Sequence, residues 1–115
     1  MTINRIENRW YWGTAVYFMT SDGSGMVMCC FNDETKDNCA LYDLIVHPSC
    51  RQHEYATDLM KAAEQEARDR GCLRLTLFTE KDSWIQDWYH RLGFVINEYT
   101  RPPHESTVWM CKKLK

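Results

Sequence analysis

Long apolar runs are absent from this 115-residue sequence, and so is an excess of charge of either sign. A helix that crosses a membrane needs roughly 20 mostly apolar residues, so we expect no membrane partner. The formal net charge is -2, which predicts no broad basic surface for nucleic acid. The first ten residues are polar and charged and lack the apolar segment of a secretion signal.

Internal repeats, long blocks of one charge and linkers rich in proline or serine are also missing. Hydrophobic residues make up 44% of the chain and charged residues 26%, a balance that is typical of a folded core. A chain of this length has the size of one domain. We therefore expect a single domain over residues 1–115.

Cysteine is the residue type that needs an explanation, because the chain has six. An exported protein of this size would use them as a disulfide framework. The export signal is missing, however, and the adjacent Cys29 and Cys30 are poor partners for ordered bridges. We expect reduced thiols and a cytoplasmic location. Most of the cysteines are expected to be small core residues, namely Cys29, Cys30, Cys39, Cys72 and Cys111.

The first part of the chain has the composition of β-strands. Residues 10–19 are aromatic and β-branched, a turn cluster occupies 21–25, and a second apolar run covers 26–31. These two runs predict an antiparallel hairpin that places the aromatic residues 10–12 in its first strand. Residues 39–46 predict a third strand.

Helical periodicity follows. One apolar stripe predicts a helix that ends at Gly71. The residues of this stripe are Ala56, Leu59, Met60, Ala63 and Ala67. A strand is expected at 73–78, a short helix at 82–92 with Asp82 or Ser83 as its N-cap, and strands at 94–99 and 107–112.

The predicted order is therefore β-β-β-α-β-α-β-β. A right-handed crossover makes strands 39–46 and 73–78 parallel, whereas the other strands can pair antiparallel. The fold class is α/β (α+β), a mixed β-sheet with helices on its faces.

The turn between the third strand and the first helix is a candidate ligand site. It covers residues 47–56, with the letters HPSCRQHEYA. Ligands in such sheets bind beyond the carboxyl ends of parallel strands, and a helix N-terminus favours an anion such as phosphate. Arg51 adds a positive charge, although a solvated arginine is the plainer reading.

Three motifs follow one another between residues 44 and 94. The first is Leu44-x-Val46-His47-Pro48-x-x-Arg51-x-x-Glu54-Tyr55-Ala56-x-x-Leu59-Met60. The second is Glu64-x-x-Ala67-Arg68-x-x-Gly71, and the third is Trp88-Tyr89-His90-Arg91-Leu92-Gly93-Phe94. In this order the motifs resemble the signature of the GNAT superfamily of acyl-CoA-dependent N-acetyltransferases. The resemblance covers about residues 39–99.

The resemblance implies a GNAT-like fold, shortened at the N-terminus, and acetyl-CoA as the co-substrate. The residues that it assigns to acetyl-CoA are Leu44, Ile45, Val46, Arg51, Gln52, His53, Glu54, Tyr55, Ala56, Thr57, Asp82 and Trp88. Glu54 stands where the family has a glycine, and Asp82 stands where many relatives have asparagine. Both departures add negative charge near the expected diphosphate.

The amino-terminal part is short, because only nine residues precede the first predicted strand. Relatives in this superfamily have a strand and two helices there, and these helices form much of the wall around the acceptor. The resemblance therefore implies an acceptor groove that is open, or that another subunit or the substrate itself completes. A homodimer is one such arrangement.

Acetyl transfer to an amine needs a polarised carbonyl, an acid for the leaving thiolate and a base for the ammonium. The resemblance assigns the acid to Tyr89, and a tyrosine with a pKa of about 10 is protonated at neutral pH. Asp43, inside an apolar strand, is the candidate base. Its rivals are Glu80, Glu98 and His90. Backbone N–H groups near Val46 would polarise the carbonyl if the strand carries the bulge of the family.

Two other interpretations of the site residues remain, a metal site and a cysteine nucleophile. His47, Cys50 and His53 have the residue types of a metal site, but no fourth ligand is evident and no metal is predicted. A nucleophilic cysteine lacks a histidine partner in the sequence context.

The sequence thus predicts an N-acetyltransferase that moves an acetyl group from acetyl-CoA to a primary amine of a small molecule, a protein lysine or a protein N-terminus. The alternative is a catalytically inactive domain of the same fold that binds a partner. The aromatic segment Trp10-Tyr11-Trp12 would suit that interface if it is exposed, and the plainer reading is a core strand.

Overall fold

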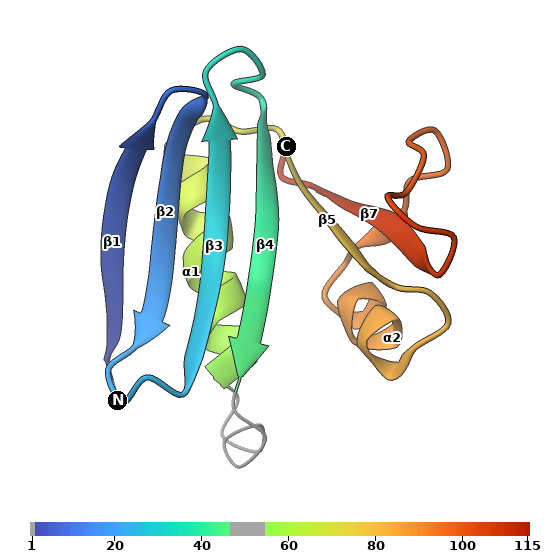
Figure 1. Ribbon diagram of the computed structural model, residues 1–115, viewed down its shortest axis with the longest axis horizontal. Coiled ribbons are helices and arrows are strands. Elements are labelled where there is room, and N and C mark those ends of the chain that lie inside the picture. Colours follow the sequence, from blue (N-terminus) through green and yellow to red (C-terminus); the bar gives the residue numbers. More distant parts are fainter. Residues whose placement is uncertain (1, 47–54) are drawn as a thin grey trace.

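A computed structural model describes residues 2–46 and 55–115 of the chain. One seven-stranded sheet has the strand order β1-β2-β3-β4-β5-β7-β6, and two helices accompany it (Figure 1). The elements are β1 (Ile3–Trp10), β2 (Gly13–Thr20), β3 (Gly25–Asn32), β4 (Asn38–Val46), α1 (Tyr55–Asp69), β5 (Arg74–Glu80), α2 (Trp84–Arg91), β6 (Val95–Ile96) and β7 (Thr107–Lys113).

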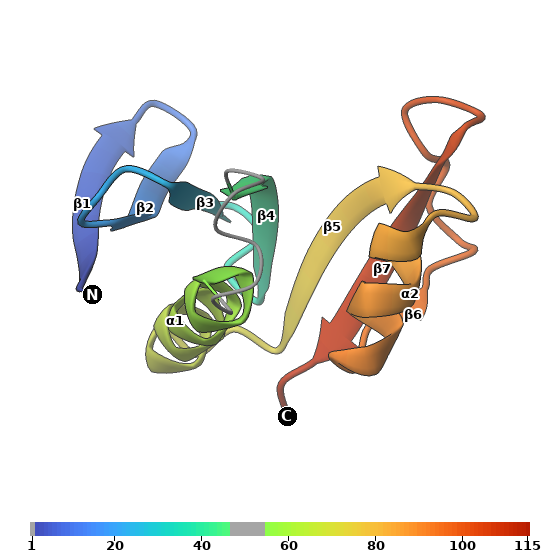
Figure 2. The same ribbon diagram turned by 90° about the horizontal axis from the view of Figure 1, so that it is seen from below.

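The mixed sheet agrees with the prediction. β4 and β5 pair in parallel, whereas every other neighbouring pair of strands is antiparallel. The parallel pair is joined through α1, as a right-handed crossover requires. Seen from below, β5 turns away from β4 and carries β7, β6 and α2 with it (Figure 2).

The amino-terminal strand was not predicted. Residues 3–10 form β1, which pairs with β2 along its whole length from Ile3↔Thr20 to Trp10↔Gly13. The predicted strand 10–19 is therefore wrong at its start, because Trp10 ends β1 and Tyr11 and Trp12 form the hairpin turn. The tip of this turn is not core, since Tyr11 is 98% exposed.

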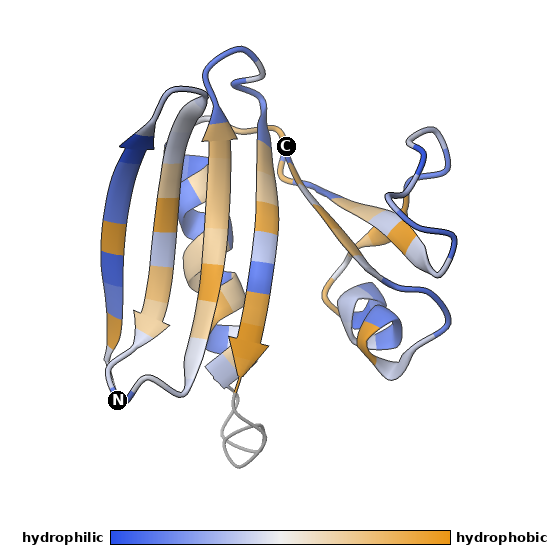
Figure 3. Ribbon diagram, in the orientation of Figure 1, coloured by the Kyte–Doolittle hydropathy of each residue, from blue (hydrophilic) through white to orange (hydrophobic). Residues whose placement is uncertain are grey.

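Sequence periodicity missed β1 because it is a polar edge strand (Figure 3). Ion pairs join it to α1 and to the turn after that helix, and Ile3 packs against the hydrophobic core. Arg5 bonds Glu66 through Nε at 2.7 Å, and Glu7 accepts from Arg70 at 2.9 Å. Arg70 in turn reaches Glu66 at 2.8 Å. A strand held in this way carries no hydrophobic alternation for a sequence pattern to detect.

Helix α1 agrees closely with its prediction. Four residues of the predicted stripe are buried, namely Leu59, Met60, Ala63 and Ala67. Its end is closed by Gly71, which has φ +78° and donates its N–H to the carbonyl of Arg68 at 3.0 Å. Glu64 and Arg68 form the expected i,i+4 pair at 3.3 Å.

The two helices lie on one face of the sheet. Leu75, Leu77 and Met110 point to that face and are almost fully buried in the same core cluster as Leu59 and Tyr89. The opposite face carries Tyr42, Phe78 and Trp109, and within residues 2–46 and 55–115 no helix covers it. This uncovered surface is called the open face below.

Neither described helix is long and apolar enough to cross a membrane. The five cysteines outside the segment 47–54 are all free thiols: Cys29, Cys39 and Cys72 are buried, and Cys30 and Cys111 are partly buried. Cys50 lies outside the described residues.

Candidate active site

The parallel strands β4 and β5 separate after a short stretch of pairing. Only residues 38–40 of β4 pair with residues 74–76 of β5. Beyond Ala40 and Thr76 the two strands diverge, and the sheet opens in the middle (Figure 2). Residues 41–46 and 77–80 therefore form the two sides of an opening rather than a continuous ladder. A ligand can enter the sheet there without breaking any interstrand pairing.

A β-bulge lies in β4 at this opening. Met26 pairs with Ile45 and Met28 pairs with Tyr42, so Val27 lies opposite both Asp43 and Leu44. Asp43 adopts the left-handed conformation with φ +54°, which aspartate tolerates better than most residues. Two residues against one interrupt the ladder of interstrand hydrogen bonds on the β4 side.

The bulge also decides which side chains face the helices. Before it, Cys39 and Leu41 are buried toward α1; after it, Leu44 and Val46 pack against the same core. Without the extra residue, strict alternation would turn Asp43 toward this apolar core. Burying that carboxylate without a partner would cost several kcal/mol or neutralise it. Asp43 is instead exposed and lines the opening.

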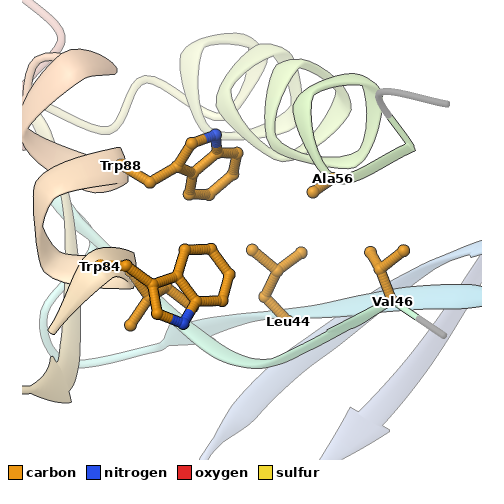
Figure 4. A pocket seen from close by; sticks show the side chains of 6 residues that line it. Leu44, Val46, Ala56, Trp84 and Trp88 are labelled. Atoms are coloured by element: carbon orange, nitrogen blue, oxygen red, sulfur yellow. The ribbon is translucent and has the colours of Figure 1, made fainter. Parts of the chain in front are cut away.

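An aromatic cavity lies between the end of β4, the start of α1 and α2. It encloses about 260 Å³ and is lined by Leu44, Val46, Ala56, Trp84, Ile85 and Trp88. The indole groups of Trp84 and Trp88 point from α2 toward Ala56 and the end of β4 (Figure 4). These two tryptophans stand four residues apart and so lie on one side of α2. The cavity suits a flat or flexible apolar group.

A second cavity extends this one through the sheet. It encloses about 330 Å³ and includes Leu44 and Ile85, which line both spaces. On the helix side it reaches Leu77 and Tyr89, and on the open face it reaches Tyr42 and Phe78. The two neighbouring cavities are named here together the through-sheet cleft, because residues from both faces of the sheet line them.

Tyr89 lies on the helix side of the through-sheet cleft. The side chain is 6% exposed and packs on Trp88 and Phe94, with ring centroids 5.2 and 5.6 Å away. Burial raises the pKa of Tyr89 to about 12, because the apolar surroundings disfavour the phenolate. The hydroxyl is therefore a proton donor throughout the physiological pH range.

The start of α2 is fixed by polar contacts that stay outside the cleft. Ser83 is the N-cap and accepts from the backbone N–H of Gln86 at 3.2 Å. Gln86 Oε1 accepts from the N–H of Asp82 at 2.7 Å, and Gln86 Nε2 meets His90 Nε2 at 3.3 Å. His90 Nδ1 reaches the carbonyl of Phe94 at 3.1 Å. Both ring nitrogens of His90 therefore take part in this chain of hydrogen bonds.

The fold brings together part of the predicted acetyl-CoA site. Leu44, Val46, Ala56 and Trp88 line the aromatic cavity. Ile45 is 57% exposed and borders the through-sheet cleft beside Asp43. Tyr55 opens α1 next to Ala56. The other predicted residues of this loop, Arg51, Gln52, His53 and Glu54, lie outside the described residues, as does the metal-like pattern of His47, Cys50 and His53.

Other predicted residues lie away from the cleft. Thr57 borders a separate hollow between α1 and Lys112, and Asp82 lines neither cavity. The rival bases Glu80 and Glu98 are exposed and do not line the cleft, so Asp43 is the one carboxylate among the described lining residues.

Several lining residues were not predicted from the sequence, namely Tyr42, Phe78, Thr79, Trp84 and Ile85. The one usable signal was the helical spacing of Trp84 with Trp88, which places both on one side of α2. Phe78 had no such signal, because its position depends on the separation of β4 from β5.

Comparisons with known proteins point to one family. A model of the acetyltransferase (GNAT) family matches residues 5–94 of the chain. A search among curated proteins finds no match.

Solved structures share the fold. An acetyltransferase of the GNAT family from Staphylococcus aureus superposes with a TM-score of 0.70 at 18% identity, covering 89% of this chain and 68% of that one. Nourseothricin acetyltransferase gives 0.69 at 18% identity and covers 98% and 85%. An acetyltransferase from Streptococcus agalactiae gives 0.73 at 15% identity and covers 87% and 67%.

Proposed function

This chain belongs to the acetyltransferase (GNAT) family, and on that basis we propose that it transfers an acetyl group from acetyl-CoA to a primary amine. One observation carries the proposal: β4 and β5 separate beyond Ala40 and Thr76, and residues from both faces of the sheet line the cleft between them. Two reactants can thus approach each other from opposite faces. Holding them in line is a large part of what such a transfer needs.

The residues present fit acetyl-CoA as the co-substrate, which supplies the acetyl group as a thioester. The aromatic cavity offers Trp84 and Trp88 to the apolar arm of the molecule, next to the first turn of α1 at Ala56. The N–H groups of that turn and the positive end of the helix dipole favour its phosphates. The narrow side chain of Ala56 leaves the backbone accessible at this point.

Tyr89 is proposed as the general acid. Its hydroxyl stays protonated up to a pH of about 12 and is a weaker acid than a free thiol of pKa about 8.5, so it acts first by donating a hydrogen bond to the sulfur as negative charge develops there. A proton moving from Tyr89 Oη to the departing sulfur is returned from solvent afterwards. Asp43, on the other side of the cleft, is proposed to accept the proton of the ammonium group, directly or through water.

The bulge at Asp43 is proposed to support the carbonyl oxygen. Beyond Ala40, β4 has no paired strand on its β5 side, so backbone N–H groups of this bulged segment can face the opening. Such fixed donors stabilise negative charge that develops on an oxygen.

Calorimetric titration with acetyl-CoA tests the proposal, followed by mass spectrometry of amines incubated with protein and acetyl-CoA. We expect saturable binding and an added mass of one acetyl group on an amine. Coenzyme A without the acetyl group serves as the matched ligand and is expected to bind without any product. Binding of neither ligand at millimolar concentration would refute the proposal.

The second candidate is an inactive domain of the same fold that binds a partner. One observation favours it: the hairpin tip between β1 and β2 exposes Tyr11 by 98% and Trp10 by 47%. Exposed aromatic residues are enriched at protein interfaces. We also propose, from the sequence, that the chain forms a homodimer and that it is located in the cytoplasm. A partner that binds the wild type but not Tyr11→Ser, together with no acetylated amine, would favour this candidate.

A further inference from the structure

The acceptor side of the through-sheet cleft has a composition that selects among amines. We propose that Tyr42 and Phe78 bind the acceptor, and that it is a primary ammonium group on an unbranched aliphatic chain without a carboxylate beside the amine. This inference rests on the proposed acetyl transfer and names its second substrate. Four features of the open face carry it.

The first feature is the aromatic lining of the mouth. The Tyr42 ring belongs to β4 and the Phe78 ring to β5, and they meet edge to face with centroids 6.1 Å apart and an interplanar angle of 71°. Both line the cleft, and Phe78 is 40% exposed. Aromatic rings attract an ammonium group over their faces and pack against the methylene groups that carry it.

The second feature is the support behind Phe78. Trp109 of β7 pairs with it and holds its ring edge to face at a centroid distance of 5.2 Å. The indole N–H of Trp109 donates to the carbonyl of Arg101 at 3.0 Å. Trp109 does not line the cleft, so it is a positioning residue that fixes the ring of Phe78.

The third feature is the charge. Among the residues that the structure describes, Asp43 is the one carboxylate that lines the cleft, and no lysine, arginine or histidine lines it. A cationic amine is attracted to Asp43, whereas the carboxylate of an amino acid is repelled by that of Asp43. An ammonium group with an adjacent carboxylate is therefore disfavoured.

The fourth feature is an apolar row that continues from the mouth across the open face. Ile6 pairs with Tyr17, Tyr17 with Met28, and Met28 with Tyr42. Adjacent strands lie about 4.8 Å apart, so the row extends roughly 14 Å from the mouth. An aliphatic stem, or the apolar part of a peptide that carries it, has a surface to lie on.

Matched amines test the charge rule. Pentylamine and norleucine share one carbon skeleton, except that norleucine carries a carboxylate beside the amine. We expect kcat/KM for pentylamine to exceed that for norleucine at least tenfold, at a pH where both amines are equally protonated. Two further acceptors distinguish a protein-bound aliphatic amine from a free one. Nα-acetyl-lysine N-methylamide represents a peptide lysine, and 1,5-diaminopentane represents a free diamine.

Variants test the aromatic lining. Phe78→Leu is expected to raise KM for pentylamine about tenfold and to leave KM for acetyl-CoA unchanged, and Phe78→Tyr is expected to restore the amine KM. Tyr99→Leu removes an aromatic ring that is fully exposed and lies outside both the cleft and the apolar row, and it is the control, with both KM values unchanged. Circular dichroism checks that each variant is folded.

The outcomes separate the two proposals. Equal or better use of norleucine, or an unchanged amine KM in folded Phe78→Leu, overturns the inference and leaves acetyl transfer standing. Binding of acetyl-CoA without acetylation of any of the four amines overturns the inference as stated, whereas failure to bind acetyl-CoA overturns the proposed function.

Discussion

Tyr42 and Phe78 touch across the part of the sheet where the backbones of β4 and β5 no longer pair. Their ring centroids lie 6.1 Å apart, although the last backbone pair between the two strands is Ala40↔Thr76. The side chains thus bridge an opening that the main chains leave. The cleft is lined by the rings of Tyr42 and Phe78 on the open face and by Tyr89 on the helix face. The residue roles proposed for the two faces can therefore be tested by separate substitutions.

Replacing the proposed acid tests the helix face. Tyr89→Phe removes the hydroxyl and keeps the ring that packs on Trp88 and Phe94. We expect kcat to fall by about 10²-fold because a positioned acid contributes on that order, with KM for acetyl-CoA within twofold of wild type. Tyr99→Phe, a hydroxyl deletion at a fully exposed side chain outside the cleft, is the control. A Tyr89→Phe enzyme with wild-type kcat would remove Tyr89 from the mechanism.

Alkaline unfolding tests the burial of the same hydroxyl. The pKa of Tyr89 is about 12 in the folded chain and about 10 in an unfolded one. The unfolded state loses this proton first, so the contribution to stability is complete below pH 10 and is lost as pH rises toward 12. It amounts to about 2–3 kcal/mol.

Urea unfolding between pH 8 and 11.5 measures this loss. Tyr89→Phe is expected to lose less free energy of unfolding over that range than wild type. Cys30, whose pKa burial raises to about 11, contributes equally to both proteins. Tyr11→Phe, at a side chain that is 98% exposed, is expected to match wild type. Parallel pH curves for wild type and Tyr89→Phe would contradict the buried state of Tyr89.

Two substitutions at Asp43 separate its charge from its backbone conformation. Asp43→Asn keeps a residue that tolerates φ +54°, so we expect stability within about 0.5 kcal/mol of wild type and kcat lowered tenfold or more at neutral pH. Asp43→Val places a β-branched residue in the left-handed region and is expected to cost about 1–3 kcal/mol.

Glu80→Gln provides the matched control for the base. Glu80 is an exposed carboxylate at the end of β5 that does not line the cleft, and its removal is expected to leave kcat unchanged. Measured pH–rate profiles of the three variants decide the assignment: if Glu80→Gln lowers kcat and Asp43→Asn does not, the base is not Asp43.

Filling the aromatic cavity tests the acetyl-CoA side. Ala56→Leu adds three carbon atoms beside Val46 and Trp88, and we expect KM for acetyl-CoA to rise at least tenfold with amine KM little changed. Gln65→Leu places a leucine on the exposed side of α1, away from the cavity, and is expected to leave KM for acetyl-CoA unchanged. If acetyl-CoA binds Ala56→Leu with the same affinity as wild type, the co-substrate binds elsewhere.

Local patterns predicted most elements, because each depends on spacing along the chain. The stripe of α1, the glycine stop at Gly71 and the short helix before Gly93 are all visible as periodicity or as residues that favour a positive φ. Local patterns did not predict β1, because its partners are charged residues of α1 and of the turn after it. Glu66 and Arg70 are two of them, and they lie about 60 residues away in sequence.

The sequence by itself determined the family resemblance, the crossover that makes β4 and β5 parallel, and Tyr89 as the candidate acid, since each rests on residue types at fixed short spacing. Only the tertiary structure decided that Asp43 lies on a bulge, that both helices share one face, and that Tyr42 and Phe78 form the mouth of the cleft. These features depend on strand register and on how far neighbouring strands diverge. One residue more or less in β4 reverses the faces of every side chain after it.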